Sequence, residues 1–225
     1  MSDSKNREIY EMIKNLIVNQ KIRPGMQLKE NDLAEKFGTS RTPIRQAFKY
    51  LEEDGLVENI SNKGTFVVDP SIADISYAYE LRVTLEKMLA EEIIDKVTTE
   101  DIQILEHYVA QEPDFYEKNE VLKYLENNKK FHLKIAKISD NRYLVEAIEE
   151  ILNAIDIHLI FYDDFNSNDL NNIQSITDHE LIIQALKEKK LPELKRIMLK
   201  HIENTCEKLK KNKEDSSQEE NCLSL

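Results

Sequence analysis

The fold of the N-terminal part of the chain is decided by one stretch, SRTPIRQAFKYLEEDGLVENISNKGTFVV, at residues 40–68. Ser40 is placed to cap a helix whose apolar residues recur every three or four positions, and Gly55 marks the end of that helix. A segment with alternating apolar and polar residues follows at 56–60, then a turn at 61–64, and residues 65–68 return as a second strand. The stretch therefore predicts a helix followed by a β-hairpin.

Two further helices are predicted before this stretch. Apolar residues at spacings of three and four indicate a helix over residues 4–19, and Pro24-Gly25 interrupts the chain after it. A short helix over 30–37 follows, with Gly38 placed as the residue that ends it. Because two short helices joined by a three-residue turn make a helix-turn-helix, this part of the chain predicts a winged helix-turn-helix domain with a small hairpin wing.

Three motifs carry a resemblance to a known family: SRTPIRQAF at 40–48, LEEDGLV at 51–57 and NKGTFV at 62–67. Their order and spacing resemble the winged-helix domain of GntR-type bacterial transcription regulators over about residues 8–69. Gln20 and Asn62 depart from the pattern, since the family often has glycine at the first position and glycine or arginine at the second. The resemblance implies binding to double-stranded operator DNA, with a wing tip made by Lys63, Gly64 and Thr65.

Arg41 and Arg45 are predicted to read the DNA bases. They are four residues apart at the start of the second helix of the motif, so both guanidinium groups can enter a groove, and each can bind a guanine edge through two hydrogen bonds. Ser40 and Thr42 suit phosphate oxygens, and Lys49 can add a backbone contact. The alternative interpretation is that both arginines are solvated charges on an exposed helix face.

The composition favours a mostly helical protein. Four glycines and five prolines in 225 residues are too few for the turns of a β-sandwich or barrel. No apolar run approaches the ~20 residues of a membrane span, and the charged first twenty residues do not resemble a secretion signal. Both cysteines lie near the C-terminus, one of them in a polar tail, which favours reduced thiols and a cytoplasmic protein without membrane contact.

The charge divides the chain into two parts. Residues 1–70 hold 11 Lys and Arg against 11 Asp and Glu, so the later residues carry the whole net charge of −12. Asp69-Pro70-Ser71 marks the junction, because proline disfavours helix at the residue before it and serine can cap the helix after it. We therefore expect a DNA-binding domain at 1–70, an all-helical effector-binding and dimerisation domain at 71–211, and a mobile tail at 212–225.

Beyond the junction the periodicity is helical. Helices are predicted at about 71–95, 99–111, 118–138, 142–163, 178–189 and 192–211. Thr98 with Asp101 and Thr177 with Glu180 resemble capping pairs at helix starts. The asparagine-rich segment 166–172 is predicted to be a polar loop.

Four short motifs in this helical part occur in a recognisable order: Glu80-Leu81-Arg82 with Leu85-Glu86, Phe131-His132 with Asn141, His179 with Ile182 and Ala185, and His201. They resemble the FCD ligand-binding domain of the FadR-like branch of GntR regulators, over most of residues 74–208. In that family a carboxylate four residues before the first histidine, together with the three histidines, commonly holds a divalent metal at the bottom of the effector pocket. Here Asn128 stands in the place of that carboxylate.

The chemistry of these residues also suits a metal site. Asn128 and His132 share one helix face, while His179 and His201 lie on two other helices. Three neutral imidazoles and an amide oxygen can bind a divalent ion such as zinc or nickel and leave room for water or a ligand carboxylate. Two alternatives stay open: the histidines are hydrogen-bonded core residues, or they bind an effector directly.

Arg82 completes the candidate effector site formed with Asn128, His132, His179 and His201. Its forked donors suit an effector carboxylate, but it can equally form a salt bridge with Glu86, four residues along the helix. His107 and His158 fit no position of the pattern and are interpreted as structural or surface residues.

Together these patterns predict a ligand-responsive transcription regulator and not an enzyme. A homodimer would place two winged helices on a palindromic operator, and a small carboxylate-bearing effector in the helical domain would modulate binding. One alternative is a metal-sensing regulator in which the ion itself is the signal. The other alternative, a metal-dependent enzyme using the histidines, lacks an acid-base residue at a fixed motif spacing beside them.

Overall fold

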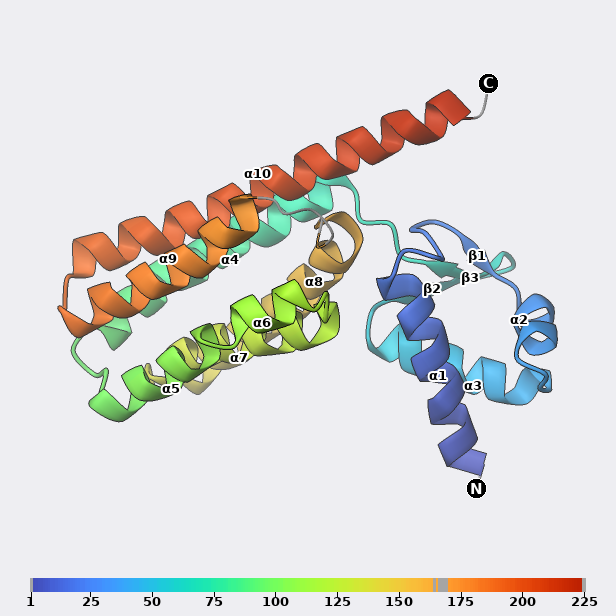
Figure 1. Cartoon of the computed structure of the whole chain (residues 1–225), viewed down its shortest axis with the longest axis horizontal. Helices are drawn as coiled ribbons and strands as arrows, with labels where there is room; N and C mark the ends of the chain where they lie inside the picture. The colour runs from blue at the N-terminus through green and yellow to red at the C-terminus, as the bar shows by residue number, and fades with distance from the viewer. Residues whose placement is uncertain (1, 164, 166–169, 224–225) are drawn as a thin grey trace. The chain divides into compact units, whose positions relative to one another are not determined.

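The structure is a computed structural model that describes residues 2–163, 165 and 170–223. The chain divides into two compact units, Met1–Pro70 and Ser71–Leu225. The expected fold class is confirmed, because helices dominate both units and a small antiparallel sheet completes a winged helix-turn-helix in the first (Figure 1).

The N-terminal unit contains a sheet that is wider than the predicted hairpin. Its elements are α1 (Ser2–Val18), β1 (Gln27–Leu28), α2 (Glu30–Lys36), α3 (Arg41–Glu53), β2 (Val57–Ile60) and β3 (Gly64–Val67). The strands are antiparallel in the order β1-β3-β2, with Val57 opposite Val67 and Gln27 opposite Phe66. β1 adds a third strand that the sequence did not predict, because two residues carry too little alternation to indicate a strand.

The apolar face of α3 packs against α1 and fixes which side of α3 remains outside. Ile13 and Ile17 of α1, and Ile44 and Leu51 of α3, have no exposed surface. Burying each of these side chains contributes about 1.5–3 kcal/mol. The opposite face of α3, which carries Arg41, stays in solvent.

Ser40 occupies the position before α3 in an extended conformation, but its side chain makes no capping hydrogen bond. The predicted cap is wrong in this respect. A capping side chain bonds to the backbone N–H of the second or third helical residue, and the third residue here is Pro43, which has no N–H. The Ser40 hydroxyl is therefore not used by the helix itself.

The two positions that depart from the winged-helix pattern share one backbone conformation. Gln20 has a φ of 53° and Asn62 has a φ of 62°. Both lie in the left-handed region, which glycine adopts without steric cost and which asparagine tolerates. Both turns thus adopt a left-handed conformation without glycine.

Seven helices form the described part of the C-terminal unit: α4 (Ile72–Ile93), α5 (Thr99–Val109), α6 (Glu112–Glu117), α7 (Val121–Lys137), α8 (Arg142–Tyr162), α9 (Leu170–Lys187) and α10 (Leu191–Leu223). α10 packs against both α4 and α9, and Figure 1 shows α10 running along one side of this bundle. Complete capping boxes begin two of the helices, Ser71 with Asp74 at α4 and Thr98 with Asp101 at α5. Among the described residues, no helix combines the length and apolar character needed to cross a bilayer.

Several predicted boundaries in this unit are wrong. Thr177 begins no helix, because α9 already starts at Leu170 and carries Thr177 in its interior. Of the predicted loop, Asn171 and Asn172 belong to α9, and residues 166–169 lie outside the described part of the chain. The helix predicted at 118–138 starts at Val121 and is preceded by the short α6, which the sequence did not predict.

The C-terminal end of the last helix also differs from the prediction. α10 continues to Leu223, so the described residues of the segment predicted as a mobile tail, 212–223, are helical. The helix can extend because residues 212–223 contain neither glycine nor proline and carry several good helix formers.

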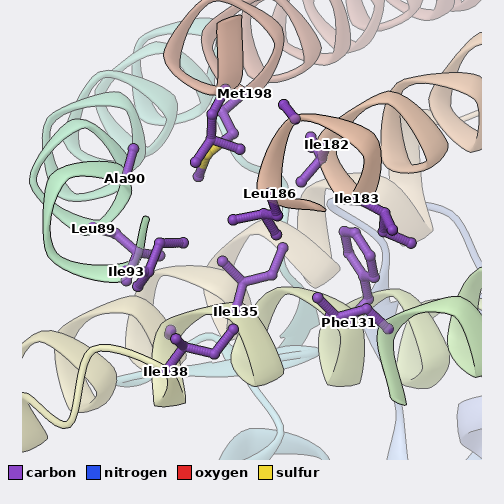
Figure 2. Close-up of a cluster of buried hydrophobic side chains, with 14 of the residues drawn as sticks. Leu89, Ala90, Ile93, Phe131, Ile135, Ile138, Ile182, Ile183, Leu186 and Met198 are labelled. Carbon is purple, nitrogen blue, oxygen red and sulfur yellow. The ribbon is translucent and has the colours of Figure 1, made fainter. Parts of the chain in front are cut away.

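The core of the C-terminal unit lies between these helices (Figure 2), and three of its residues are neighbours of the predicted histidines. Phe131, fully buried, precedes His132 on α7, and the buried Ile182 lies three residues after His179 on α9. Met198, three residues before His201, is 2% exposed. Because each histidine is close in sequence to a buried core residue, core packing fixes the position of each histidine along the bundle. Phe131→Ala would lower the free energy of unfolding by about 3–5 kcal/mol.

Candidate functional site

Three buried histidines meet inside the C-terminal unit. His132 comes from α7, His179 from α9 and His201 from α10, and none exposes more than 4% of its surface. One nitrogen from each ring lies within 4.8 Å of those from the other two. The ring centroids are 4.8–5.5 Å apart. The structure thus brings together the three histidines that the sequence spacing singled out.

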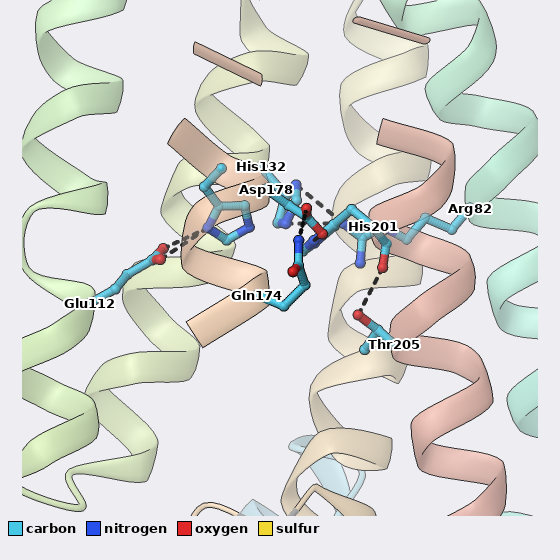
Figure 3. A network of polar contacts seen from close by, with 8 residues as sticks. Arg82, Glu112, His132, Gln174, Asp178, His201 and Thr205 are labelled. Carbon is cyan, nitrogen blue, oxygen red and sulfur yellow. Dashed lines mark hydrogen bonds and ion pairs between the residues drawn. The ribbon is translucent and has the colours of Figure 1, made fainter. Parts of the chain in front are cut away.

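Two carboxylates stand behind two of these rings (Figure 3). Both oxygens of Glu112 lie 2.9 and 3.0 Å from Nδ1 of His179, and both side chains are completely buried. Asp178 Oδ2 lies 3.6 Å from Nδ1 of His201 and is itself held by Gln174, which donates a hydrogen bond to Oδ1. A carboxylate on Nδ1 fixes the proton there and leaves the Nε2 lone pair free. Nε2 of His179 is buried and has no hydrogen-bond partner among the described residues.

Arg82 is a buried cation that borders the same cluster. It is 3% exposed, and its Nε donates to Glu86 Oε1 at 2.7 Å. Its Nη2 lies 3.1 and 3.0 Å from the two ring nitrogens of His132. The predicted Arg82–Glu86 salt bridge is confirmed, and the remaining guanidinium donors still reach the histidine site.

The environment keeps His132 and His201 neutral. Burial lowers the pKa of His132 well below 6.5, and the positive charge of Arg82 lowers it further. Burial also lowers the pKa of His201 to about 4, although Asp178 opposes the shift. Neutral imidazole is the form that can bind a metal ion.

The donors that these residues present fit a divalent metal ion. Three neutral imidazole nitrogens are a frequent ligand set for zinc, and the carboxylates behind His179 and His201 orient the rings as at known metal sites. Without a ligand, Nε2 of His179 is a buried polar atom that forms no bond within the described part of the chain. Asn128, 8% exposed, lies one helical turn from His132 and offers a neutral amide oxygen.

A cavity of about 440 Å³ opens onto this cluster. Arg82, Asn128 and His201 are part of its wall, and most of its other lining residues are polar or charged: Asp163, Gln174, Ser175, Asp178, Asn204, Thr205, Glu207, Lys208, Lys211 and Asn212. Lys208 and Asp163 form an ion pair of 2.5 Å in this wall. A cavity with this lining suits a polar ligand that carries charge.

In the N-terminal unit, the two arginines predicted to read DNA are bound to one acid. Nε of Arg41 donates to Glu30 Oε2 at 3.0 Å, and Nε of Arg45 donates to Glu30 Oε1 at 2.8 Å. The arginine side chains are 55% and 59% exposed. Both arginines are thus exposed to solvent but paired with a carboxylate. Glu30 of α2 holds the two guanidinium groups on the outer face of α3.

The other predicted DNA contacts lie around these arginines. Ser40 and Thr42 line a shallow surface hollow at the start of α3, and Lys49 is exposed farther along the helix. In the wing, Gln27 of β1 donates a hydrogen bond to the backbone oxygen of Lys63 at 2.6 Å. Gly64 has a φ of +108°, and a Cβ added there would lie 3.0 Å from the Gln27 amide nitrogen, so a side chain would strain this turn.

Three residues of these sites were not predicted from the sequence. Asp178 directly precedes His179, and an acid beside a candidate ligand is a signal that could have been noticed. Glu112 lies on a helix of six residues that was not predicted, so no local pattern points to it. Glu30 is an acid in the first turn of α2, which is ordinary at a helix start. His107 is exposed and His158 is buried on α8, and neither belongs to the histidine cluster.

Comparison with known proteins agrees with this architecture. Residues 5–67 match the sequence profile described as bacterial regulatory proteins, gntR family, and residues 77–204 match the profile of the FCD domain. The chain belongs to the FCD branch of the GntR family. It is therefore a transcription regulator with a DNA-binding helix-turn-helix domain and a ligand-binding helical domain, as the sequence predicted.

Relatives of this FCD-type GntR regulator span nearly its whole length. The uncharacterized HTH-type transcriptional regulator YdhC of Bacillus subtilis is 29% identical over 205 residues, which cover 90% of each chain. The HTH-type transcriptional repressor RspR of Escherichia coli K12 is 24% identical over 94% of this chain and 92% of its own. The structure of E. coli McbR/YncC superposes with a TM-score of 0.66 at 20% identity, covering 91% of this chain and 96% of that one, and so shares the fold.

Proposed function

We propose that this regulator binds a palindromic operator as a homodimer and that a small carboxylate-bearing effector in the helical domain changes its operator affinity. The observation that carries the proposal is the polar cavity of about 440 Å³, which ends on Arg82, Asn128 and His201 beside the histidine cluster. A cavity with a buried guanidinium at its wall favours an anionic ligand, because forked donors match a carboxylate.

His132, His179 and His201 would hold a divalent metal ion such as zinc or nickel. Asn128 is buried one helical turn before His132 on the same helix, and would contribute its amide oxygen. A bound ion would supply positive charge and open coordination positions to an effector carboxylate. Glu112 and Asp178 would keep two of the rings in the binding orientation. No catalytic step is needed for this role.

On the DNA side, Arg41 and Arg45 would contact base edges in the major groove, with Glu30 setting the directions of their guanidinium groups. Ser40 would contact phosphate, since its hydroxyl is not used to cap α3. Thr42 and Lys49 would add backbone contacts, as would the wing tip at Lys63, Gly64 and Thr65.

The second candidate function is a metal sensor, in which the ion alone is the signal. The histidine cluster favours this candidate, because its nitrogens converge and its carboxylates are in place without any effector. The cavity favours an effector, because a regulator that senses only the metal ion would not require it.

The test starts with metal analysis of protein purified without chelator. Operator affinity is then measured with zinc or nickel alone and with the same metal plus a panel of small carboxylates. An effector-controlled regulator responds to metal plus one class of carboxylate, whereas a sensor responds to metal alone. His132→Ala and His201→Ala should lose the response, and His107→Ala, an exposed histidine of the same unit, should keep it. A response that survives in all three variants would overturn the assignment of the site.

A further inference from the structure

Helix α4 is apolar on two faces, and only one of them is used inside its own chain. Ile75, Tyr79 and Leu89 face the core and expose at most 2% of their surfaces. On the other face, Tyr77 is 68% exposed and Leu81 and Met88 are each 51% exposed. A helix on the surface of a monomer has one apolar stripe, so a second stripe on α4 calls for a partner.

The exposed residues of α4 form a continuous stripe. Tyr77, Leu81, Thr84 and Met88 follow one another at spacings of four, three and four, so they line one side of the helix. Thr84 adds little bulk at the middle of the stripe, and its hydroxyl is already bonded to the backbone oxygen of Glu80 at 3.1 Å. Three of the five large hydrophobic residues that are exposed in the described part of the C-terminal unit belong to this stripe.

One edge of the stripe carries two opposite charges. Glu80 and Lys87 lie seven residues apart on the same edge of α4, and both are exposed. Within the described residues, neither of them forms an ion pair with another side chain. The edge therefore offers one negative and one positive group for contacts outside the chain.

These features complement a second copy of the same helix. A two-fold axis through Thr84, perpendicular to α4, pairs the two copies of the helix antiparallel. A residue before Thr84 in one copy then lies opposite the residue equally far after Thr84 in the other copy. Leu81 then lies within one residue's rise of Met88 of the second copy, and Glu80 within one residue's rise of Lys87 of the second copy. Each contact occurs twice, as an isologous interface requires.

A parallel pairing does not achieve this match. A two-fold axis along α4 brings the edge with Glu80 and Lys87 against the opposite edge of the stripe in the second copy, which offers Glu80 no positive partner. Burying a carboxylate without a partner is unfavourable. The charge pattern therefore selects the antiparallel arrangement.

We propose that two copies of this chain associate through the α4 stripe, antiparallel about a two-fold axis at Thr84. Leu81 and Met88 form the apolar centre of the interface, and Glu80 forms two symmetric ion pairs with Lys87 of the other copy. The inference deepens the proposed function, since two DNA-reading units need a dimer, and rests on it for the expectation that a dimer exists. It adds which surface makes the dimer.

The first test uses sedimentation equilibrium of the full chain. Leu81→Glu should raise the dimer dissociation constant at least about tenfold, because two carboxylates enter the apolar centre. Leu181→Glu is the matched control, since Leu181 lies on α9 outside the stripe and is 42% exposed. It should leave the dimer unchanged, and equal helical content of the two variants by circular dichroism shows that both are folded.

The second test exchanges the charges. Glu80→Lys and Lys87→Glu should each weaken the homodimer roughly three- to tenfold, because each creates two like-charge pairs at a solvent-exposed edge. An equimolar mixture of the two variants should recover wild-type affinity, since every pair in the mixed dimer is again opposite in sign. A structural role of either residue within its own chain would not produce recovery on mixing.

Three results would overturn the inference. They are a Leu81→Glu protein as dimeric as wild type, a mixture no tighter than its components, and a wild-type chain that sediments as a monomer. The first two leave the proposed function standing with a dimer formed elsewhere, whereas the third removes the two-headed operator reader as well. DNA retention by Leu81→Glu at low salt, through its unchanged Arg41 and Arg45, separates loss of the dimer from loss of the DNA-binding unit.

Discussion

The carboxylate of Glu112 faces Nδ1 of His179, with its two oxygens 2.9 and 3.0 Å away and both side chains fully buried. This contact joins residues 67 positions apart in the chain. It fixes the proton of the imidazole on the side away from His132 and His201 and leaves Nε2 as the only ring atom that can serve a ligand.

Glu112→Gln should therefore weaken metal binding by roughly 10- to 100-fold, as is usual when the partner of a metal-binding histidine is removed. An amide can donate to Nδ1 and so favours the wrong tautomer. Competition against a chromophoric chelator measures the effect. Glu117→Gln, on the same helix but exposed, is the control and should bind like wild type. Equal affinity of both variants would show that Glu112 does not orient a ligand.

Asn128→Asp should tighten metal binding. The substitution is nearly isosteric and adds a negative charge one helical turn from His132, where the chain has only a neutral amide. The same chelator competition measures it, and Asn127→Asp at the neighbouring helix position is the comparison. If neither wild type nor the Asn128→Asp variant binds an ion, the three histidines hold effector or core contacts and no metal.

Glu30→Gln should lower operator affinity while leaving non-specific DNA binding equal or stronger. The two guanidinium groups lose the acid that holds them, but the protein also loses a negative charge near phosphate. Arg41→Ala or Arg45→Ala should each weaken the free energy of operator binding by roughly 1–3 kcal/mol. Gel-shift titrations at fixed salt on operator and on unrelated DNA give both values, with Glu35→Gln of the same helix as control. Unchanged discrimination in Glu30→Gln would contradict the role assigned to Glu30.

His158 should make the protein less stable as the pH falls from about 6.5 to about 4. Burial lowers the pKa of His158 to about 4, partly opposed by the charge of Asp74, whereas the unfolded chain takes up this proton near 6.5. The unfolded state therefore binds more protons in that window, and stability drops by up to about 3 kcal/mol. Urea unfolding across this pH range should show a smaller drop in His158→Gln. If the free energy of unfolding falls equally with pH in wild type and in His158→Gln, the role assigned to His158 is contradicted.

The sequence predicted the parts of the molecule that depend on local signals. The predicted cap Ser71 and the pair Thr98 with Asp101 begin helices, and the three histidines meet because each is next to apolar residues of regular spacing. The other predicted pair, Thr177 with Glu180, has similar local chemistry. It fails because α9 begins upstream at Leu170, and a threonine cap has no function inside a helix.

Two partners of the predicted site residues could not be predicted from the sequence. Glu112 reaches His179 only through the packing of α6 and α9 in the bundle, and Glu30 reaches Arg41 only through the angle between α2 and α3. Neither contact leaves a spacing pattern, since the partners belong to different elements. A single sequence thus predicts which residues can bind a ligand, and the tertiary fold decides which charges hold them.

The central claim is that ligand in the helical unit and operator on the DNA-binding unit affect each other. The most direct test is calorimetric titration of metal and carboxylate ligand into the protein alone and into the protein saturated with operator. Because linkage is reciprocal, we expect operator to change ligand affinity at least about fivefold, by the same factor as ligand changes operator affinity. Ligand that binds with one affinity in both states would contradict the claim.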